Sequence, residues 1–85
     1  MHLSPTADEV RQVVARVFRH YDEGPDIEER LRLEDGELVA RCYRATELFA
    51  MWLVKVDLLQ FYDSDGNMMH TINLRVMMSA DRLAA

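Results

Sequence analysis

The sequence predicts an α+β fold in which an N-terminal helix packs on an antiparallel sheet of four to five strands, arranged as a meander of hairpins. Three observations lead to this prediction. Apolar residues recur at helical spacing near the N-terminus, two pairs of strand-like segments flank glycine-containing turns, and the most apolar segment, residues 48–54, lies between those pairs. At 85 residues, the chain is expected to form a single domain over residues 1–85.

The N-terminal helix is predicted to run from about Pro5 to Tyr21. Two start signals overlap, because Ser4 precedes Pro5 while Thr6 and Glu9 have the spacing of a capping box. The apolar residues that follow recur every three or four positions, so they share one face of the helix and would lie on a sheet. These residues are Val10, Val13, Val14, Val17, Phe18 and Tyr21.

The first hairpin is predicted around Asp35-Gly36, a dipeptide typical of two-residue turns. Before the turn, Leu31 and Leu33 alternate with charged residues and predict a half-exposed strand. Residues 37–44 are predicted to form the partner strand. Its alternating side chains place Leu38, Ala40 and Cys42 on one face and Val39, Arg41 and Tyr43 on the other.

Residues 46–56 admit two interpretations, because a continuous apolar run satisfies the periodicity of both a strand and a helix. In the first, residues 48–54 form a central strand covered on both faces. In the second, Thr46 caps a helix over residues 46–56, and the element order becomes αββαββ. The strand is favoured because Phe49, Trp52 and Val54 suit a pleated sheet and the neighbouring segments are strands.

A second hairpin is predicted from residues 58–62 and 68–74. Its connector, residues 63–67, is rich in turn-forming residues and contains Gly66, which adopts positive φ without strain. After this hairpin, Ser79 is expected to begin a short C-terminal helical turn.

Composition narrows the functional classes. The net charge of −5 disfavours nucleic-acid binding, and no apolar run approaches the ~20 residues that span a bilayer, so we expect no membrane insertion. A single cysteine, Cys42, and the lack of a signal-peptide pattern predict a cytoplasmic location. The acidity is concentrated in residues 22–37, where eight acidic residues accompany two arginines. This acidic stretch is either a solvated edge or a docking surface for a basic protein.

No recognised catalytic, nucleotide-binding or metal-binding motif is present in the sequence, so we expect no cofactor and no metal. The predicted function is therefore a non-catalytic, self-associating or protein-binding module, and the small apolar chain predicts a homodimer. The alternative is a ligand-binding or catalytic protein with a pocket between helix and sheet. The residues expected to line a pocket or an interface are Tyr43, Trp52, Tyr62, His70, Met77 and Met78.

Overall fold

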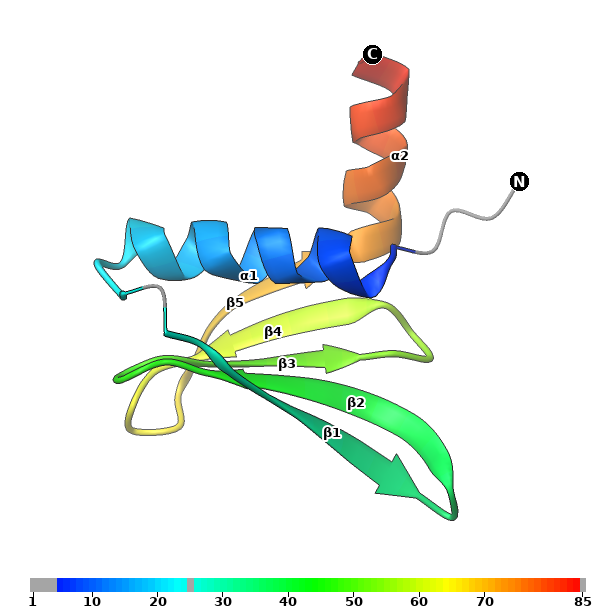
Figure 1. Ribbon diagram of the computed structural model, residues 1–85. Helices are drawn as coiled ribbons and strands as arrows, with labels where there is room; N and C mark the ends of the chain where they lie inside the picture. Colours follow the sequence, from blue (N-terminus) through cyan, green and yellow to red (C-terminus); the bar gives the residue numbers. More distant parts are fainter. Residues whose placement is uncertain (1–4, 25, 85) are drawn as a thin grey trace.

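The computed structural model describes residues 5–24 and 26–84, and it confirms the predicted α+β fold (Figure 1). A helix precedes five strands, and a second helix follows them. The elements are α1 (Ala7–His20), β1 (Glu28–Glu34), β2 (Glu37–Arg44), β3 (Phe49–Leu53), β4 (Leu58–Tyr62), β5 (Met68–Asn73) and α2 (Leu74–Ala84). No described helix is long and apolar enough to cross a membrane.

The strands form one antiparallel sheet in the order β1-β2-β3-β4-β5, so each strand pairs with its neighbour in sequence. The strand interpretation of the apolar core is thus confirmed, and the αββαββ alternative is wrong. Asp35 and Gly36 both have positive φ, as a type I′ turn between β1 and β2 requires. Gly66, at φ 83°, serves the turn before β5.

Helix α1 begins at the predicted capping box. Thr6 Oγ1 accepts a hydrogen bond from the Glu9 amide at 3.1 Å, and Glu9 Oε1 accepts one from the Thr6 amide at 3.0 Å. Ser4, the alternative cap, lies outside the described residues. Figure 1 shows α1 lying across one face of the sheet, and its buried residues include Val10, Val14 and Phe18.

Helix α2 begins at Leu74, five residues before the predicted start at Ser79. The side chain of Asn73 accepts a hydrogen bond from the Val76 amide at 3.2 Å, which is a helix-capping contact. The Leu74 amide donates to the backbone carbonyl of Asp57 at 2.9 Å. These contacts fix the chain direction after β5, and α2 then projects away from the sheet on the side of α1 (Figure 1).

The core lies between α1 and the sheet. On the central strands it consists of Tyr43, Ala50, Trp52, Leu59 and Phe61, and the Phe61 ring meets that of Phe18 edge to face at 6.0 Å. Alternate residues of β3 and β4 are only half-buried. The expectation that residues 48–54 are covered on both faces is therefore wrong, because the described part of the chain supplies a helix to one face only.

Candidate interaction surface

The face of the sheet opposite α1, hereafter the open face, is apolar at its centre. Residues directly opposite each other in neighbouring strands point to the same face, so the register defines its members. Its central row runs from Cys42 through Met51 to Gln60. With the rows on either side, the apolar residues of the open face are Ala40, Cys42, Phe49, Met51, Leu53, Leu58 and Tyr62.

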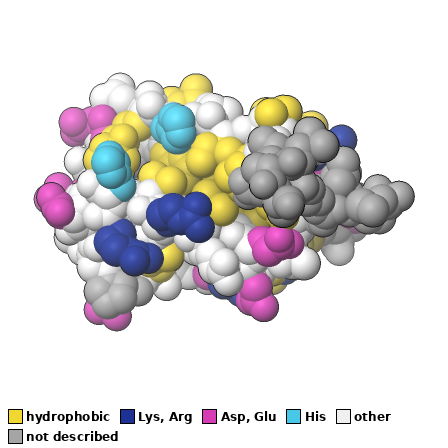
Figure 2. Space-filling model, turned by 90° about the horizontal axis from the view of Figure 1, so that it is seen from above, with side chains coloured by type: hydrophobic (Ala, Val, Ile, Leu, Met, Phe, Trp, Pro, Cys, Tyr) yellow, Lys and Arg dark blue, Asp and Glu magenta, His cyan; other side chains and the backbone are white. Residues whose placement is uncertain are grey.

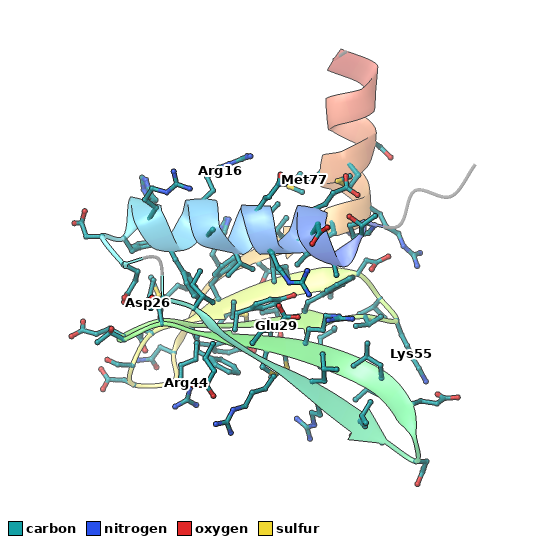
Figure 3. All side chains as sticks on the ribbon, viewed as in Figure 1. Arg16, Asp26, Glu29, Arg44, Lys55 and Met77 are labelled. Carbon is teal, nitrogen blue, oxygen red and sulfur yellow. The ribbon has the colours of Figure 1, made fainter. Side chains whose placement is uncertain are left out.

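All of these side chains except Ala40 are half-buried, because each is shielded only by neighbours within the sheet. Polar side chains border them. The register places Arg30 and Arg32 toward the β1 edge and Thr71 and Asn73 toward the β5 edge. Figure 3 shows side chains projecting from this side of the sheet, with Arg44 pointing away from α1. The open face is therefore an apolar centre with a polar rim.

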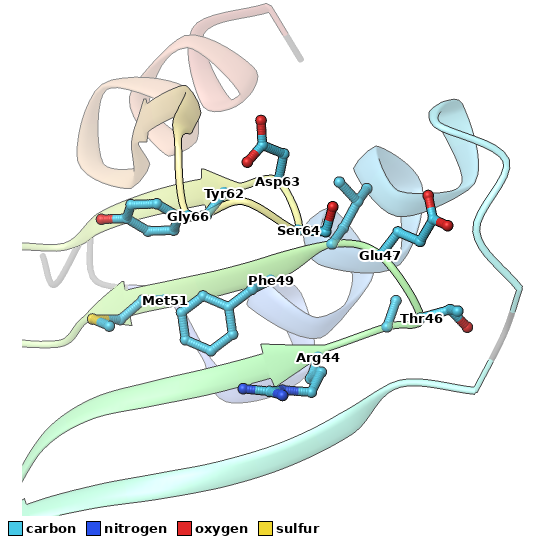
Figure 4. Close-up of a pocket in the computed structure, with 11 residues that line it drawn as sticks. Arg44, Thr46, Glu47, Phe49, Met51, Tyr62, Asp63, Ser64 and Gly66 are labelled. Atoms are coloured by element: carbon cyan, nitrogen blue, oxygen red, sulfur yellow. The ribbon is translucent and has the colours of Figure 1, made fainter.

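A shallow hollow of about 480 Å³ lies at one end of the open face (Figure 4). Its lining includes Phe49, Met51 and Tyr62, together with residues of the β2–β3 and β4–β5 turns. The rings of Phe49 and Tyr62 are 5.9 Å apart, and the Arg44 guanidinium carbon lies 5.8 Å from the centre of the Phe49 ring. The hollow thus combines an aromatic floor with a positively charged side chain.

The predicted site residues do not converge on one site. Tyr43 and Trp52 are buried beneath α1, whereas Tyr62 belongs to the open face. His70 is exposed on β5, and Met77 and Met78 lie on α2. Tyr62 was predicted to line either an interface or a pocket between helix and sheet, and it lines a hollow on the opposite face of the sheet. Its neighbours there, Phe49 and Met51, were not among the predicted residues.

The chain matches no family model, and no curated protein or solved structure matches it.

A buried carboxylate lies next to Trp52. Asp57 is 3% exposed, and its Oδ1 accepts a hydrogen bond from Trp52 Nε1 at 3.2 Å. Its Oδ2 accepts one from Arg75 Nε at 3.0 Å. Both carboxylate oxygens of Asp57 therefore accept hydrogen bonds from other side chains of the protein. Through Arg75, Asp57 joins the β3–β4 turn to the start of α2.

A second charged cluster joins α1 to the sheet. Arg11 Nε donates to Glu29 Oε1 at 2.6 Å, and Arg41 donates to Glu29 Oε2 at 2.9 Å. The hydrogen bond from Arg11 lowers the pKa of the Glu29 carboxyl, and Arg41 acts in the same direction. Arg11 also pairs with Asp8 at 2.7 Å. This cluster lies on the helix-covered side of the sheet.

Tyr43 lies in the core near this cluster. Burial, reinforced by the negative charge of Glu29, raises the pKa of its hydroxyl to about 12. That hydroxyl is buried and has no hydrogen-bond partner among the described residues. Tyr43 therefore stays protonated at neutral pH and contributes to packing through its ring.

The acidic stretch, residues 22–37, is partly neutralised within the molecule. Glu28 pairs with Arg30, Glu34 with Arg32, and Glu37 with Lys55, in addition to the Glu29 cluster. Half of its eight acidic residues thus have a cationic partner. This pairing reduces the negative charge that a basic partner would meet.

Among the described residues, no group of three or more His, Cys, Asp and Glu side chains is close enough together to hold a metal ion. Cys42 is half-buried on the open face, and burial raises the pKa of its thiol. The thiolate form, which is the nucleophile, is therefore disfavoured at neutral pH.

Proposed function

We propose that the protein is a non-catalytic interaction module that forms homodimers, and that it binds another protein through the open face. The observation that carries this proposal is the uncovered apolar centre of that face, formed by half-buried side chains of β2, β3 and β4. In an antiparallel sheet with one face on a core, the other face is ordinarily polar. A contiguous apolar area rimmed by polar residues is typical of a protein-binding surface.

The distribution of polar groups also supports a binding role. Asp57, Arg75, Glu29 and Arg41 are engaged in contacts that join elements of the fold. An active site needs polar groups that converge on a pocket and remain free to contact a substrate. On the open face, the half-buried rings of Phe49 and Tyr62 instead line a shallow hollow.

The open face is tested with Met51→Lys, which places a charge at its centre. Because a lysine stem packs along apolar surface while its ammonium group stays in water, the fold should tolerate this change. In a pull-down from cell lysate, we expect Met51→Lys to fail to retain proteins that the wild type retains. Val76→Lys is the matched control, since Val76 is 65% exposed on α2, away from the open face.

Equal retention of partners by wild type and Met51→Lys, with both proteins folded by circular dichroism, would contradict the proposal. Loss of partners by Val76→Lys alone would move the binding surface to α2. Size measurements on the same variants separate partner binding from self-association. If Met51→Lys also abolishes the dimer, the occupant of the open face is a second copy of the chain.

A second candidate function is small-molecule binding in the hollow on the open face. The observation that favours it is the aromatic floor of Phe49 and Tyr62 next to Arg44, which suits a flat apolar molecule carrying an anionic group. A rise in melting temperature with aromatic carboxylates would support this function, because such a ligand binds the folded state only. The rise should be absent in Arg44→Gln.

A further inference from the structure

The two edge strands of the sheet differ in how strongly their sequences oppose pairing with another chain. β1, at one edge, has the sequence EERLRLE, in which five of seven residues are charged. β5, at the other edge, has the sequence MMHTIN, which contains no acidic residue, arginine or lysine. Charged residues on an edge strand discourage pairing with another chain. β5 lacks this protection, and all but one of its residues are exposed.

Self-pairing of β1 over its full length would be opposed by its own sequence, whereas shorter ladders centred on Arg30 or Arg32 place arginine opposite glutamate. Two copies related by a twofold axis perpendicular to the sheet pair residues whose numbers have a constant, even sum, because the faces must match. Centred on Leu31, such a ladder places Glu28 opposite Glu34 and Arg30 opposite Arg32. Like charges directly opposite each other destabilise a strand pair.

Self-pairing of β5 meets no such opposition. Centred on Thr71, the ladder places Thr71 opposite its own copy and His70 opposite Ile72. Threonine pairs are favourable across antiparallel strands. The register shift in the β4–β5 pairing skips Met69, so it lies beyond the central residues of this ladder. The three central residues of β5 are therefore regular and self-complementary.

Apolar side chains are exposed on β5 and on the helix side of the molecule. Met68 and Met69 of β5 are 56% and 37% exposed. Figure 2, which looks onto the helices, shows a hydrophobic area in the middle of this side, bordered by histidine and basic side chains. A few main-chain hydrogen bonds set the direction of a strand pair, and adjoining apolar side chains add buried area to it.

We propose that two copies of the chain pair through β5, antiparallel and centred on Thr71, to form one continuous ten-stranded sheet. In this dimer, both α1 helices lie on one side and the two open faces join on the other. This inference rests on the self-association in the proposed function but not on partner binding. It leaves the open face available to a partner and doubles its extent.

The test is a symmetric disulfide at Thr71. In the proposed ladder, the two Thr71 Cα atoms are ~4.5–5.5 Å apart, within the ~4.4–6.8 Å range that a disulfide spans. Thr71→Cys is made in a Cys42→Ser background and oxidised with diamide. We expect a covalent dimer on a non-reducing gel. Leu31→Cys, at the exposed edge formed by β1, is the matched control and should remain monomeric on the gel.

A second variant keeps the inference falsifiable if the cysteine variant misfolds. Thr71→Lys places two ammonium groups opposite each other, so the wild-type dimer should dissociate, whereas Leu31→Lys should have no effect. A wild-type monomer in sedimentation at tens of micromolar would overturn the inference together with self-association. A dimer that Thr71→Lys leaves intact, or that cross-links through Leu31→Cys, would overturn the β5 pairing alone. Loss of lysate partners in Met51→Lys tests partner binding alone, and its outcome does not depend on the results for the dimer.

Discussion

Trp52 Nε1 donates a buried hydrogen bond of 3.2 Å to Asp57 Oδ1. This bond satisfies the only polar group of the Trp52 side chain, the largest side chain in the core. The same carboxylate receives Arg75 from α2 at 3.0 Å. Asp57 also has φ 52°, a conformation that Asp tolerates better than most residues. Asp57 thus accepts a hydrogen bond from the core, adopts the backbone conformation that the β3–β4 turn needs, and pairs with the start of α2.

Asp57→Ala should therefore destabilise the protein strongly. The change leaves the Trp52 N–H without a partner in a dry environment and places alanine at positive φ. We expect the free energy of unfolding to fall by about 2–4 kcal/mol, measured by urea denaturation. Asp57→Asn is the control, because it retains an acceptor oxygen and tolerates positive φ. An equal loss for both variants would show that the charge on Asp57, rather than the hydrogen bond, provides the stability.

The sequence allowed the elements themselves to be predicted because their signals are local. The capping box at Thr6, the Asp35-Gly36 turn and the apolar stripe of α1 each lie within a few residues. The early start of α2 was not predicted because it depends on Asn73, whose capping role emerges only once β5 ends beside the β3–β4 turn.

The open face was not predicted for a different reason. In an all-apolar run, every residue suits burial, so periodicity does not distinguish Ala50 and Trp52, which face α1, from Phe49 and Met51, which do not. Only the pairing register and the position of a single covering helix separate the two sets. The Arg11–Glu29 contact is likewise invisible locally, because 18 residues separate its partners.

Tyr43→Phe should maintain or raise stability. The Tyr43 hydroxyl is buried without a hydrogen-bond partner among the described residues, so folding removes it from water without compensation. Deleting it should raise the free energy of unfolding by up to about 1 kcal/mol in thermal or urea denaturation. A clear decrease would indicate that this hydroxyl bonds to an ordered water in solution. Trp52→Phe, which instead removes a bonded donor, should lower stability.

Stability should decline in acid partly through Glu29. Its pKa in the folded protein is lowered from the ordinary 4.5, chiefly by the hydrogen bond from Arg11. The carboxylate therefore stabilises the fold above pH 4.5, and this contribution is lost as pH falls through the lower folded value. Glu29→Gln should be less stable than wild type at pH 7, and its stability should fall less steeply below pH 5.

The control for this pH dependence is Glu28→Gln, which removes the same charge from an exposed position on β1 and should leave the slope nearly unchanged. A residual slope is expected in Glu29→Gln, because backbone hydrogen bonds from Asn67 and Asp65 also lower the pKa of Asp63. If wild type and Glu29→Gln lose stability in parallel between pH 5 and pH 3, then Glu29 is not a source of the acid sensitivity.

The acidic stretch can be tested without disturbing the fold, because the structure separates its paired members from the rest. Glu29 is part of the Arg11 and Arg41 cluster, so reversing its charge would disrupt the packing of α1. Asp22, Asp26 and Asp35 are exposed and form no salt bridge with another described residue. Their replacement by Asn also suits the positive φ at Asp22 and Asp35.

We expect the triple Asp→Asn variant at residues 22, 26 and 35 to retain both its unfolding midpoint and its lysate partners. Exposed charges contribute little to stability, and internal pairing has already reduced the charge of this stretch. Pull-downs at low and high salt provide the measurement. A basic protein captured by the wild type at low salt, released at high salt and absent from the variant would show that these carboxylates dock a partner.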